Sequence, residues 1–267
     1  MINGGKIGVG IVTFNRPQGL LKLHRSLPKE LISEFVIVDD GDWCEEFNQI
    51  EDYSFWIHTQ RSGVGKAKNA ALKYLLEKKC DHIFLIEDDI FIKDPQVFEK
   101  YIEASKVSGI QHFNYSQHGM MNKAWPEGVA DPLNIIDYKT SQIALYRHCV
   151  GAFSYYSKKC LDKVGLLDER YYNACEHVDH TYEIIKVGMH PPFWFFADIH
   201  NSWEYLGDEE WSLTQSTISS NPKHQEMVQK ADAIFVEKHG HLPGHTPLTS
   251  DDDVIKSLKE IKKTYGK

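Results

Sequence analysis

Cysteine is scarce in this sequence, and its few copies show no paired spacing. The five cysteines are an odd number, and none belongs to a Cys-x-x-Cys motif. This usage fits a reducing compartment and argues against a disulfide framework or a cysteine-ligated zinc site. Long apolar runs are also missing, since no stretch approaches the roughly 18–20 residues that a helix needs to cross a bilayer. We therefore expect a cytoplasmic protein without a transmembrane segment, for which peripheral contact with a membrane stays open.

The sequence also has no surplus of positive charge. Lys and Arg number 30 against 38 Asp and Glu, which gives a net charge of −8. Proteins that bind nucleic acid need basic side chains for the phosphates, so no nucleic-acid partner is expected. The remaining composition, 42% hydrophobic and 25% charged, is that of a soluble globular protein. Nothing in the pattern indicates an oligomeric state.

The first half of the chain alternates short apolar runs with helical stretches, which is typical of a mainly parallel sheet flanked by helices. Strands are expected at residues 7–13, 35–40, 54–60 and 82–89, with helices at 17–27 and 66–80. After residue 97 the pattern is less regular, with strands expected at 110–115, 148–157 and 193–199 and helices at 97–107, 158–168 and 176–188. From about residue 222 the tail is expected to be helical, with Thr249 or Ser250 capping the last helix.

The buried strand expected at 82–89 ends in three carboxylates, namely Glu87, Asp88 and Asp89. Ligands of open α/β sheets bind at the carboxyl ends of the strands. Adjacent acids repel one another unless a cation neutralises them, and oxygen ligands suit Mg²⁺ or Mn²⁺. The triplet therefore indicates a divalent metal site, although a solvated acidic turn is the alternative reading of an isolated triplet.

Two other strands also end in polar residues. Asp39 and Asp40 close the strand at 35–40, and the first strand is followed by a cluster made of Thr13, Asn15 and Arg16. Between the second and third clusters, the segment RSGVGKAKNAAL enters a helix with Lys66 and Lys68 in its first turn. A helix N-terminus with basic side chains favours an anion. We expect all of these groups to meet at one edge of the sheet.

The motifs IVTFNRP, VIVDDGD, GVGKAKNAAL and FLIEDDIFIKDP occur in this order over residues 7–95. Their order and spacing resemble the N-terminal half of glycosyltransferase family 2, which implies a GT-A type of fold. The resemblance implies a nucleotide pocket built from seven residues: Thr13, Asn15, Arg16, Asp39, Asp40, Lys68 and Asp88. Within it, Asp39 is expected to read the base, Asp40 to lie beside the ribose, and Lys68 to face the pyrophosphate. Glu87 and Asp89 take the D-x-D positions, with Asp89 as the direct ligand of Mn²⁺ or Mg²⁺.

The segment YYNACEHVDHTYEIIKVG (171–188) resembles the acceptor side of the same family. His177 stands where inverting members carry the catalytic base, and an imidazole can serve as a general base near neutral pH. Glu176 or Asp179 could take that role instead, or the enzyme could retain configuration and need no base there. Residues that only cap a helix are the structural alternative.

Histidines and aromatic residues supply weaker signals. WFFADIHNSW (194–203) resembles the strand and loop from which many GT-A enzymes offer a histidine to the metal, so His200 is a candidate ligand against the commoner structural role. The histidines 239, 241 and 245 fit a surface loop better than a metal site. The loop at 112–125 has the amides and aromatics of a sugar-binding surface, where Trp125 could stack on a pyranose or be a buried aromatic.

The expected function is that of a metal-dependent glycosyltransferase. The resemblance implies transfer from a nucleotide sugar, taken as a UDP-sugar, to a glycan acceptor with inversion; by family analogy, the pathway is bacterial surface polysaccharide synthesis. Residues 1–115 would bind the nucleotide sugar, residues 116–221 the acceptor, and residues 222–267 would form a helical extension. The alternatives are a sugar-phosphate nucleotidyltransferase and a non-catalytic sugar-binding module.

Overall fold

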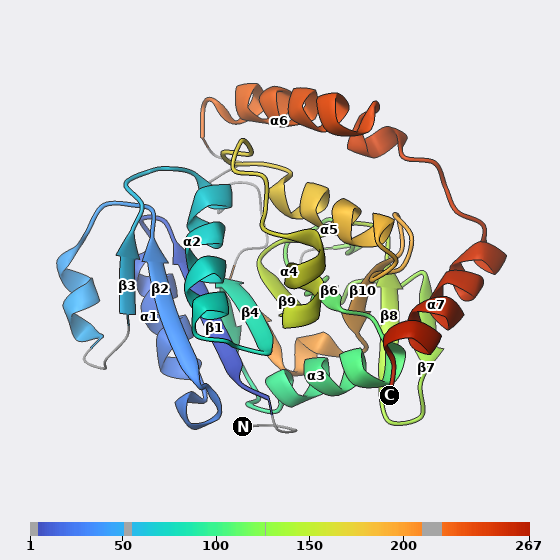
Figure 1. The fold of residues 1–267 in the computed structure, drawn as a ribbon. Coiled ribbons are helices and arrows are strands. Elements are labelled where there is room, and N and C mark those ends of the chain that lie inside the picture. The colour runs from blue at the N-terminus through green and yellow to red at the C-terminus, as the bar shows by residue number, and fades with distance from the viewer. Residues whose placement is uncertain (1–4, 51–54, 126, 210–220) are drawn as a thin grey trace.

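The central element of the protein is a mainly parallel sheet of six strands (Figure 1). The computed structural model describes residues 5–50, 55–125, 127–209 and 221–267. Within them, the strand order is β3 (Phe55–His58), β2 (Glu34–Asp39), β1 (Ile7–Thr13), β4 (His82–Glu87), β9 (Phe153–Ser157) and β6 (His112–Asn114). The pairs among β1 to β4 are parallel, whereas β9 is antiparallel to both of its neighbours. The mainly parallel α/β sheet expected from the sequence is confirmed.

Helices cover both faces of this sheet because the side chains of its strands alternate. Phe84 and Ile86 of β4 join a core that contains α1 (Pro17–Ser26) and α3 (Val97–Ser108). Ile83 and Leu85 join a second core with α2 (Val64–Glu77), α4 (Lys158–Val164) and α5 (Glu176–Lys186). Strand periodicity thus sends successive residues into opposite layers. The helices expected at 17–27, 66–80, 97–107, 158–168 and 176–188 are all present with slightly different ends.

Two glycines in β1 allow α2 to approach the sheet closely. A Cβ atom at Gly10 would lie 2.7 Å from Cβ of Ala71, and one at Gly8 would lie 2.9 Å from Cδ2 of Leu75. Side chains at either position would therefore push α2 outward. Because α2 begins at the carboxyl ends of the strands, this packing fixes its first turn beside the polar clusters.

The second half adds smaller elements around the sheet. An antiparallel sheet has the order β10 (Phe196–Ile199), β8 (Gln142–Tyr146) and β7 (Asn134–Asp137), and β5 (Ile90–Ile92) pairs with β11 (Leu206–Asp208). Four short 3-10 turns complete the described elements, at Lys29–Leu31, Glu45–Gln49, Ser202–Glu204 and Pro243–His245. The sequence pattern did not predict β5, β7, β8 or β11. Three of them have only three or four residues, too few to show a period, and three of the four residues of β7 are exposed.

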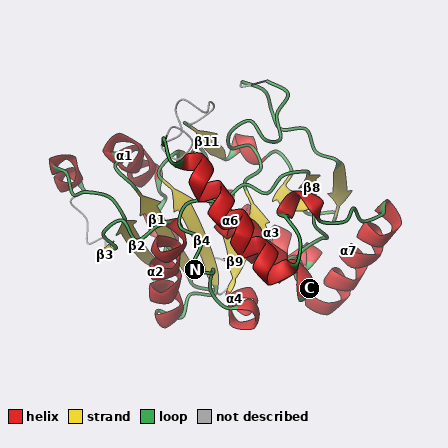
Figure 2. Ribbon diagram, turned by 90° about the horizontal axis from the view of Figure 1, so that it is seen from above, coloured by secondary structure: helices red, strands yellow, loops and turns green. Residues whose placement is uncertain are grey.

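The tail is helical, as expected, and its two helices lie apart. α7 (Asp251–Tyr265) packs on α3 through its apolar face, and Ser250 caps it by accepting a hydrogen bond from the Asp253 amide at 3.2 Å. α6 (His224–His239) runs across the molecule above the carboxyl ends of the strands (Figure 2). Among the described residues, no helix combines the length and the apolar character needed to span a membrane. The division into halves with separate binding roles stays a prediction.

Candidate active site

The three polar clusters meet at one edge of the sheet. The strand register pairs Thr13 with Asp39 and Val12 with Glu87, so the ends of β1, β2 and β4 lie side by side. A cavity of about 250 Å³ opens at this edge. Of the residues that the sequence predicts, the following line it: Thr13, Arg16, Asp40, Glu87, Asp88 and Asp89. The parallel topology thus assembles a polar site from segments far apart in the chain.

Asp88 is buried and held by β1. Its Oδ2 accepts hydrogen bonds from Oγ1 of Thr13 at 2.7 Å and from the Phe14 amide at 3.2 Å. Burial and the neighbouring charge of Asp89 raise the pKa of Asp88 to about 7, although Arg16 opposes this shift. Asp88 therefore attaches the acidic loop to β1. The adjacent carboxylates of Asp88 and Asp89 repel each other, and a cation would reduce this repulsion.

Asp89 has one carboxylate oxygen engaged and one unsatisfied. Its Oδ2 lies 3.3 Å from Nη1 of Arg16 and 3.7 Å from Nε2 of His118. Its Oδ1 is buried and makes no hydrogen bond to any part of the chain that the structure describes. A buried carboxylate oxygen without a donor is costly, and a divalent cation would satisfy it. Together with Glu87 two positions earlier, Asp89 therefore fits the metal that the resemblance implies.

His118 completes this corner of the cavity and is held by Asp208, and the sequence interpretation missed both residues. Nδ1 of His118 lies 2.9 Å from Oδ1 of Asp208. Burial lowers the pKa of His118, but Asp89 and Asp208 outweigh it and raise the pKa to about 9. The pairing of β11 with β5, in which Asp208 stands opposite Ile90, carries Asp208 to the acids. No local pattern could show this, because the two residues lie 90 positions apart.

Three residues predicted to bind the nucleotide also shape the surrounding loops. Asp40 accepts hydrogen bonds from the amides of Ser62 at 2.7 Å and Gly63 at 2.9 Å, which fixes the loop before α2. Asn15, at a φ of 54°, accepts one from the Asp42 amide at 2.8 Å. Asp39 is fully buried, and its Oδ2 makes no hydrogen bond within the described residues, although Nδ1 of His58 lies 3.3 Å away. Asn15 and Asp39 lie outside the cavity wall.

Two aromatic side chains also line the cavity. Phe14 and Tyr172 both line it and are 38% and 47% exposed. The guanidinium carbon of Arg61 lies 5.5 Å from the centre of the Phe14 ring, and the Tyr172 hydroxyl donates to the Arg61 carbonyl at 3.0 Å. Exposed rings beside a cationic plane are suited to stacking on a planar base. The sequence reading did not include these three residues in the site.

Lys68 is placed differently from its expected position against a pyrophosphate. Its Nζ is buried between the Oε1 atoms of Glu87 at 2.6 Å and Glu176 at 2.8 Å, and it donates to the Gly151 carbonyl at 3.2 Å. Burial lowers the pKa of Lys68, but the two carboxylates outweigh it and raise the pKa above its usual range. Lys68 therefore links the predicted metal acids on β4 to the predicted catalytic segment on α5.

Glu176 and His177 are adjacent and hydrogen-bonded at the start of α5. Nδ1 of His177 lies 3.1 Å from Oε1 of Glu176, and the imidazole side chain is 23% exposed. Glu176 is buried; burial raises its pKa, but Lys68 and then His177 outweigh this and hold it well below the usual range. Glu176 is thus an anion held by the ammonium group of Lys68 and by a hydrogen bond from His177, and the imidazole is the more accessible group of the pair.

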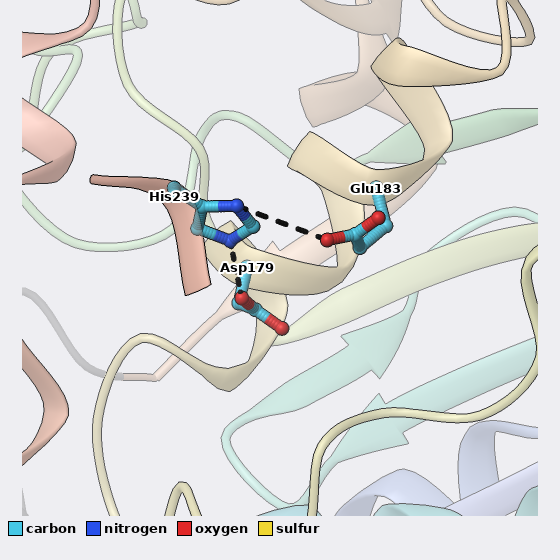
Figure 3. A group of neighbouring side chains, drawn as sticks. All are labelled: Asp179, Glu183 and His239. Carbon is cyan, nitrogen blue, oxygen red and sulfur yellow. Dashed lines mark hydrogen bonds and ion pairs between the residues drawn. The ribbon is translucent and has the colours of Figure 1, made fainter. Parts of the chain in front are cut away.

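Asp179 points away from Glu176, toward α6. It accepts hydrogen bonds from Nζ of Lys238 at 2.5 Å and from Nε2 of His239 at 2.8 Å. Figure 3 shows the His239 ring between Asp179 and Glu183, a grouping whose ligand-type atoms lie within 4.8 Å of one another. Nζ of Lys186 also lies 2.9 Å from Nδ1 of His239. The ammonium groups of Lys186 and Lys238 already occupy this cluster, so we interpret it as an ion-pair network that joins α5 to α6. His239 belongs to α6, and not to a loop as the sequence had suggested.

His200 lies elsewhere. It lines a separate cavity with residues of the β7–β8 turn, such as Lys139 and Thr140, and shares none of the wall around Asp89. Nδ1 of His200 is buried without a hydrogen bond in the described chain. Trp125 is 62% exposed, which favours the surface reading over the buried one.

The chain is similar to known proteins in sequence and in fold. The chain is 26% identical over 229 residues to an uncharacterised glycosyltransferase of Acanthamoeba polyphaga mimivirus, covering 80% of this chain and 85% of the relative. It is similar in structure to S. aureus TarS residues 1–349 in complex with UDP-GlcNAc, with a TM-score of 0.56, 13% identity, and 98% of this chain and 73% of that chain covered. No family model matches the chain.

A mannosyltransferase from Pyrobaculum calidifontis, solved with GDP-Man and Mn²⁺, overlaps more weakly. Its TM-score is 0.47 at 12% identity, and the alignment covers 67% of this chain but only 52% of that one. This overlap supports no inference by itself. The sequence relative, the TarS-like fold and the four strand-edge motifs together identify the chain as a glycosyltransferase of the GT-A fold.

Proposed function

We propose that this chain transfers a sugar from a UDP-sugar to a hydroxyl group of a glycan acceptor, with inversion at the anomeric carbon. The observation that carries the proposal is the cavity at the sheet edge, where Asp89 presents a buried unsatisfied oxygen beside Arg16. Acids that need a cation, next to a basic side chain, suit a diphosphate bound with a metal ion. The exposed rings of Phe14 and Tyr172 give the base a stacking surface at the same cavity.

Glu87 and Asp89 are the residues that would hold the metal. When bound, Mn²⁺ or Mg²⁺ would neutralise the charge that builds on the leaving diphosphate. Arg16 adds a fixed positive charge at the same place, since its guanidinium contacts both Asp88 and Asp89. Asp40 orders the loop that leads to Gly63 and Val64 in the cavity wall, so the first turn of α2 also faces the donor.

The base that we propose is His177. Its Nδ1–H donates to Glu176, which leaves Nε2 as the basic nitrogen of the neutral imidazole. The acceptor hydroxyl loses its proton to Nε2 as its oxygen forms a bond to the anomeric carbon, and the bond from that carbon to the diphosphate oxygen breaks. The electron pair of the broken bond leaves with the diphosphate, so charge and protons balance.

Glu176 and Asp179 are less suited to this role. Both are buried, Glu176 is paired with Lys68, and Asp179 is paired with Lys238 and His239. A carboxylate whose cationic partners stabilise its ionised form is a weak proton acceptor. We assign to Glu176 the task of fixing the tautomer and orientation of His177, and to Asp179 the attachment of α6.

For the setting of the reaction, we propose the cytoplasm and a surface glycan of a bacterium as acceptor. The support is the absence of a spanning helix in the described residues and the family analogy in the motifs. The mimivirus relative shows that such chains are not restricted to bacteria.

The test is a panel of nucleotide sugars incubated with the full chain and Mn²⁺. We expect release of UDP from one UDP-sugar, slowly to water and faster with a glycan acceptor, and a product of inverted configuration. Release of pyrophosphate from a nucleoside triphosphate and a sugar phosphate would replace this proposal by a nucleotidyltransferase. Binding of a sugar without any turnover would replace it by a binding module.

A further inference from the structure

His118 stands between two carboxylates at the wall of the cavity. Its Nε2 lies 3.7 Å from Oδ2 of Asp89, and its Nδ1 lies 2.9 Å from Oδ1 of Asp208. The imidazole side chain is largely buried, with 17% of its surface exposed, and the Asp208 side chain is 7% exposed. Nε2 therefore lies toward Asp89, whose carboxylate is suited to a cation, and Nδ1 lies toward Asp208, whose carboxylate holds the ring.

This arrangement is the one in which proteins present a histidine to a metal. A ligating imidazole commonly donates its second N–H to a carboxylate, which fixes the tautomer and makes the ligating nitrogen more basic. When the ring gives up a proton on binding a cation, donation from Nδ1 to Asp208 leaves Nε2, on the side of Asp89, as the nitrogen that carries the lone pair. The buried Oδ1 of Asp89 accepts no hydrogen bond from the described residues, and it is the second atom that we expect to coordinate the metal.

Asp208 is itself held firmly enough to orient a ligand. Its Oδ2 accepts a hydrogen bond from the Gly119 amide at 3.0 Å and lies 3.6 Å from Nζ of Lys123. Its backbone belongs to β11, which pairs with β5, the strand that directly follows the acidic triplet in the sequence. Asp208 thus fixes both the imidazole and the backbone that follows it, so the ring cannot easily turn away from Asp89.

We propose that His118 is a nitrogen ligand of the divalent cation held by Asp89, and that Asp208 is the residue that positions it. This inference rests on the metal site of the proposed function and replaces His200 as the histidine of that site. His200 lines a different cavity and shares no wall with Asp89. A consequence follows for metal choice: an imidazole nitrogen among the ligands favours Mn²⁺ over Mg²⁺, because Mg²⁺ takes oxygen ligands in strict octahedral geometry.

The experiment measures Mn²⁺ binding to the full chain without any assay of turnover. Electron paramagnetic resonance counts free Mn²⁺ during a titration, in the absence and presence of UDP, and electron spin-echo modulation detects a ¹⁴N nucleus coordinated to the bound ion. For the wild-type chain we expect one tight site with a ¹⁴N coupling. His118→Ala and His118→Gln should lose the coupling and bind Mn²⁺ at least tenfold more weakly.

Asp208→Asn should keep the coupling and weaken Mn²⁺ binding about 10- to 100-fold, the usual effect of removing the partner of a ligating histidine. His200→Ala and Asp131→Asn, at residues outside the site, serve as matched controls and should bind Mn²⁺ like the wild type. Circular dichroism of each variant confirms that the fold is intact, and the milder His118→Gln is used if His118→Ala unfolds.

The outcomes separate this inference from the proposed function. If Asp89→Asn abolishes Mn²⁺ binding while both His118 variants keep the affinity and the ¹⁴N coupling, His118 is not a ligand, but the metal-dependent function stands. A coupling lost only in His200→Ala would return the role to His200. If the wild-type chain binds no Mn²⁺ even with UDP, both this inference and the metal-dependent mechanism are overturned.

Discussion

Lys68 and Glu176, 108 positions apart in the chain, form a buried ion pair of 2.8 Å between α2 and α5. The same ammonium group lies 2.6 Å from Glu87 at the end of β4. One buried cation therefore neutralises two carboxylates, one from the predicted metal site and one beside the proposed base. A single side chain thus links Glu87, which lines the cavity, to Glu176, which does not.

Replacing Lys68 by Met should destabilise the protein by about 3–5 kcal/mol, because the change leaves two buried carboxylates without their cation. Chemical denaturation followed by circular dichroism measures this loss. Lys66→Met, at an exposed position of the same helix, is the control and should change the unfolding free energy little. Adding Glu176→Gln to Lys68→Met should recover part of the loss; no recovery would mean that Lys68 acts through packing alone.

Asp89→Asn should abolish turnover and weaken Mn²⁺ binding while the fold stays intact. The amide keeps the shape of the side chain but removes the negative charge at the oxygen that the described residues leave unsatisfied. Turnover and Mn²⁺ titration of the same preparation give both readouts, with Asp131→Asn as the exposed control. Undiminished turnover of the variant, or of the wild type in excess chelator, would contradict a metal-dependent mechanism.

The sheet and its polar edge could be predicted because both depend on local patterns. Alternating apolar runs and helices indicate parallel strands, and parallel strands must end at a common edge. Thr13, Asp40 and Asp89 therefore meet in one cavity as expected. Their individual roles toward a nucleotide and a metal stay predictions.

The parts that could not be predicted depend on contacts between distant segments. Asp208 reaches His118 only because three residues of β11 pair with β5, and such a short strand shows no period in the sequence. The side chain of Lys68 does not line the cavity, because its ammonium group binds Glu176 on α5. A motif fixes residue types, but the direction of a long side chain depends on which charges the fold brings to it.

Asp39→Asn should raise the dissociation constant for UDP about 10-fold or more, as expected from loss of a charge-assisted hydrogen bond of roughly 1.5–3 kcal/mol. The buried Oδ2 of Asp39 makes no hydrogen bond in the described residues and could accept one from a base N–H. Calorimetry measures the affinity, with Asp81→Asn near the start of β4 as a control. Equal affinities would place the base against Phe14 and Tyr172 alone.

Stability should fall as the pH drops from about 6.5 toward 4. Burial lowers the pKa of His180 and of His190 to about 4 in the folded state, below the ordinary value of about 6.5. Between these values the unfolded chain binds more protons than the folded one, so acid favours unfolding. By this linkage, each histidine should lower the free energy of unfolding by about 2 kcal/mol at pH 5, relative to neutral pH.

The geometry at His190 supports this expectation. Its Nδ1 donates to the Pro191 carbonyl at 2.8 Å, and its Nε2 accepts from the Ala197 amide at 3.2 Å, which only the neutral ring can do. Urea denaturation at pH 7.5 and pH 5 measures the loss. Glutamine cannot be protonated in this range, so His190→Gln should remove the part of the pH dependence of the unfolding free energy that His190 causes. His245→Gln, in the Pro243–His245 turn, should leave that dependence unchanged.

The last prediction concerns His177. If its imidazole is the base, His177→Ala should lower the catalytic rate about 10²–10⁴-fold with donor binding little changed. The ring contacts Glu176 on α5, and Glu176 in turn pairs with Lys68 on α2, which also pairs with Glu87 on β4.

Glu176→Gln and Asp179→Asn separate the base from its neighbours. Glu176→Gln should lower the catalytic rate less than His177→Ala does, because it removes the partner that orients the ring and leaves the ring itself in place. Asp179→Asn should chiefly lower stability, since Asp179 binds Lys238 and His239 of α6. If Glu176→Gln is inactive while His177→Ala keeps most of its rate, the carboxylate is the base despite its ion pair with Lys68. If the product retains the anomeric configuration, no base is needed at this place, and the contact of 3.1 Å between His177 and Glu176 serves the fold alone.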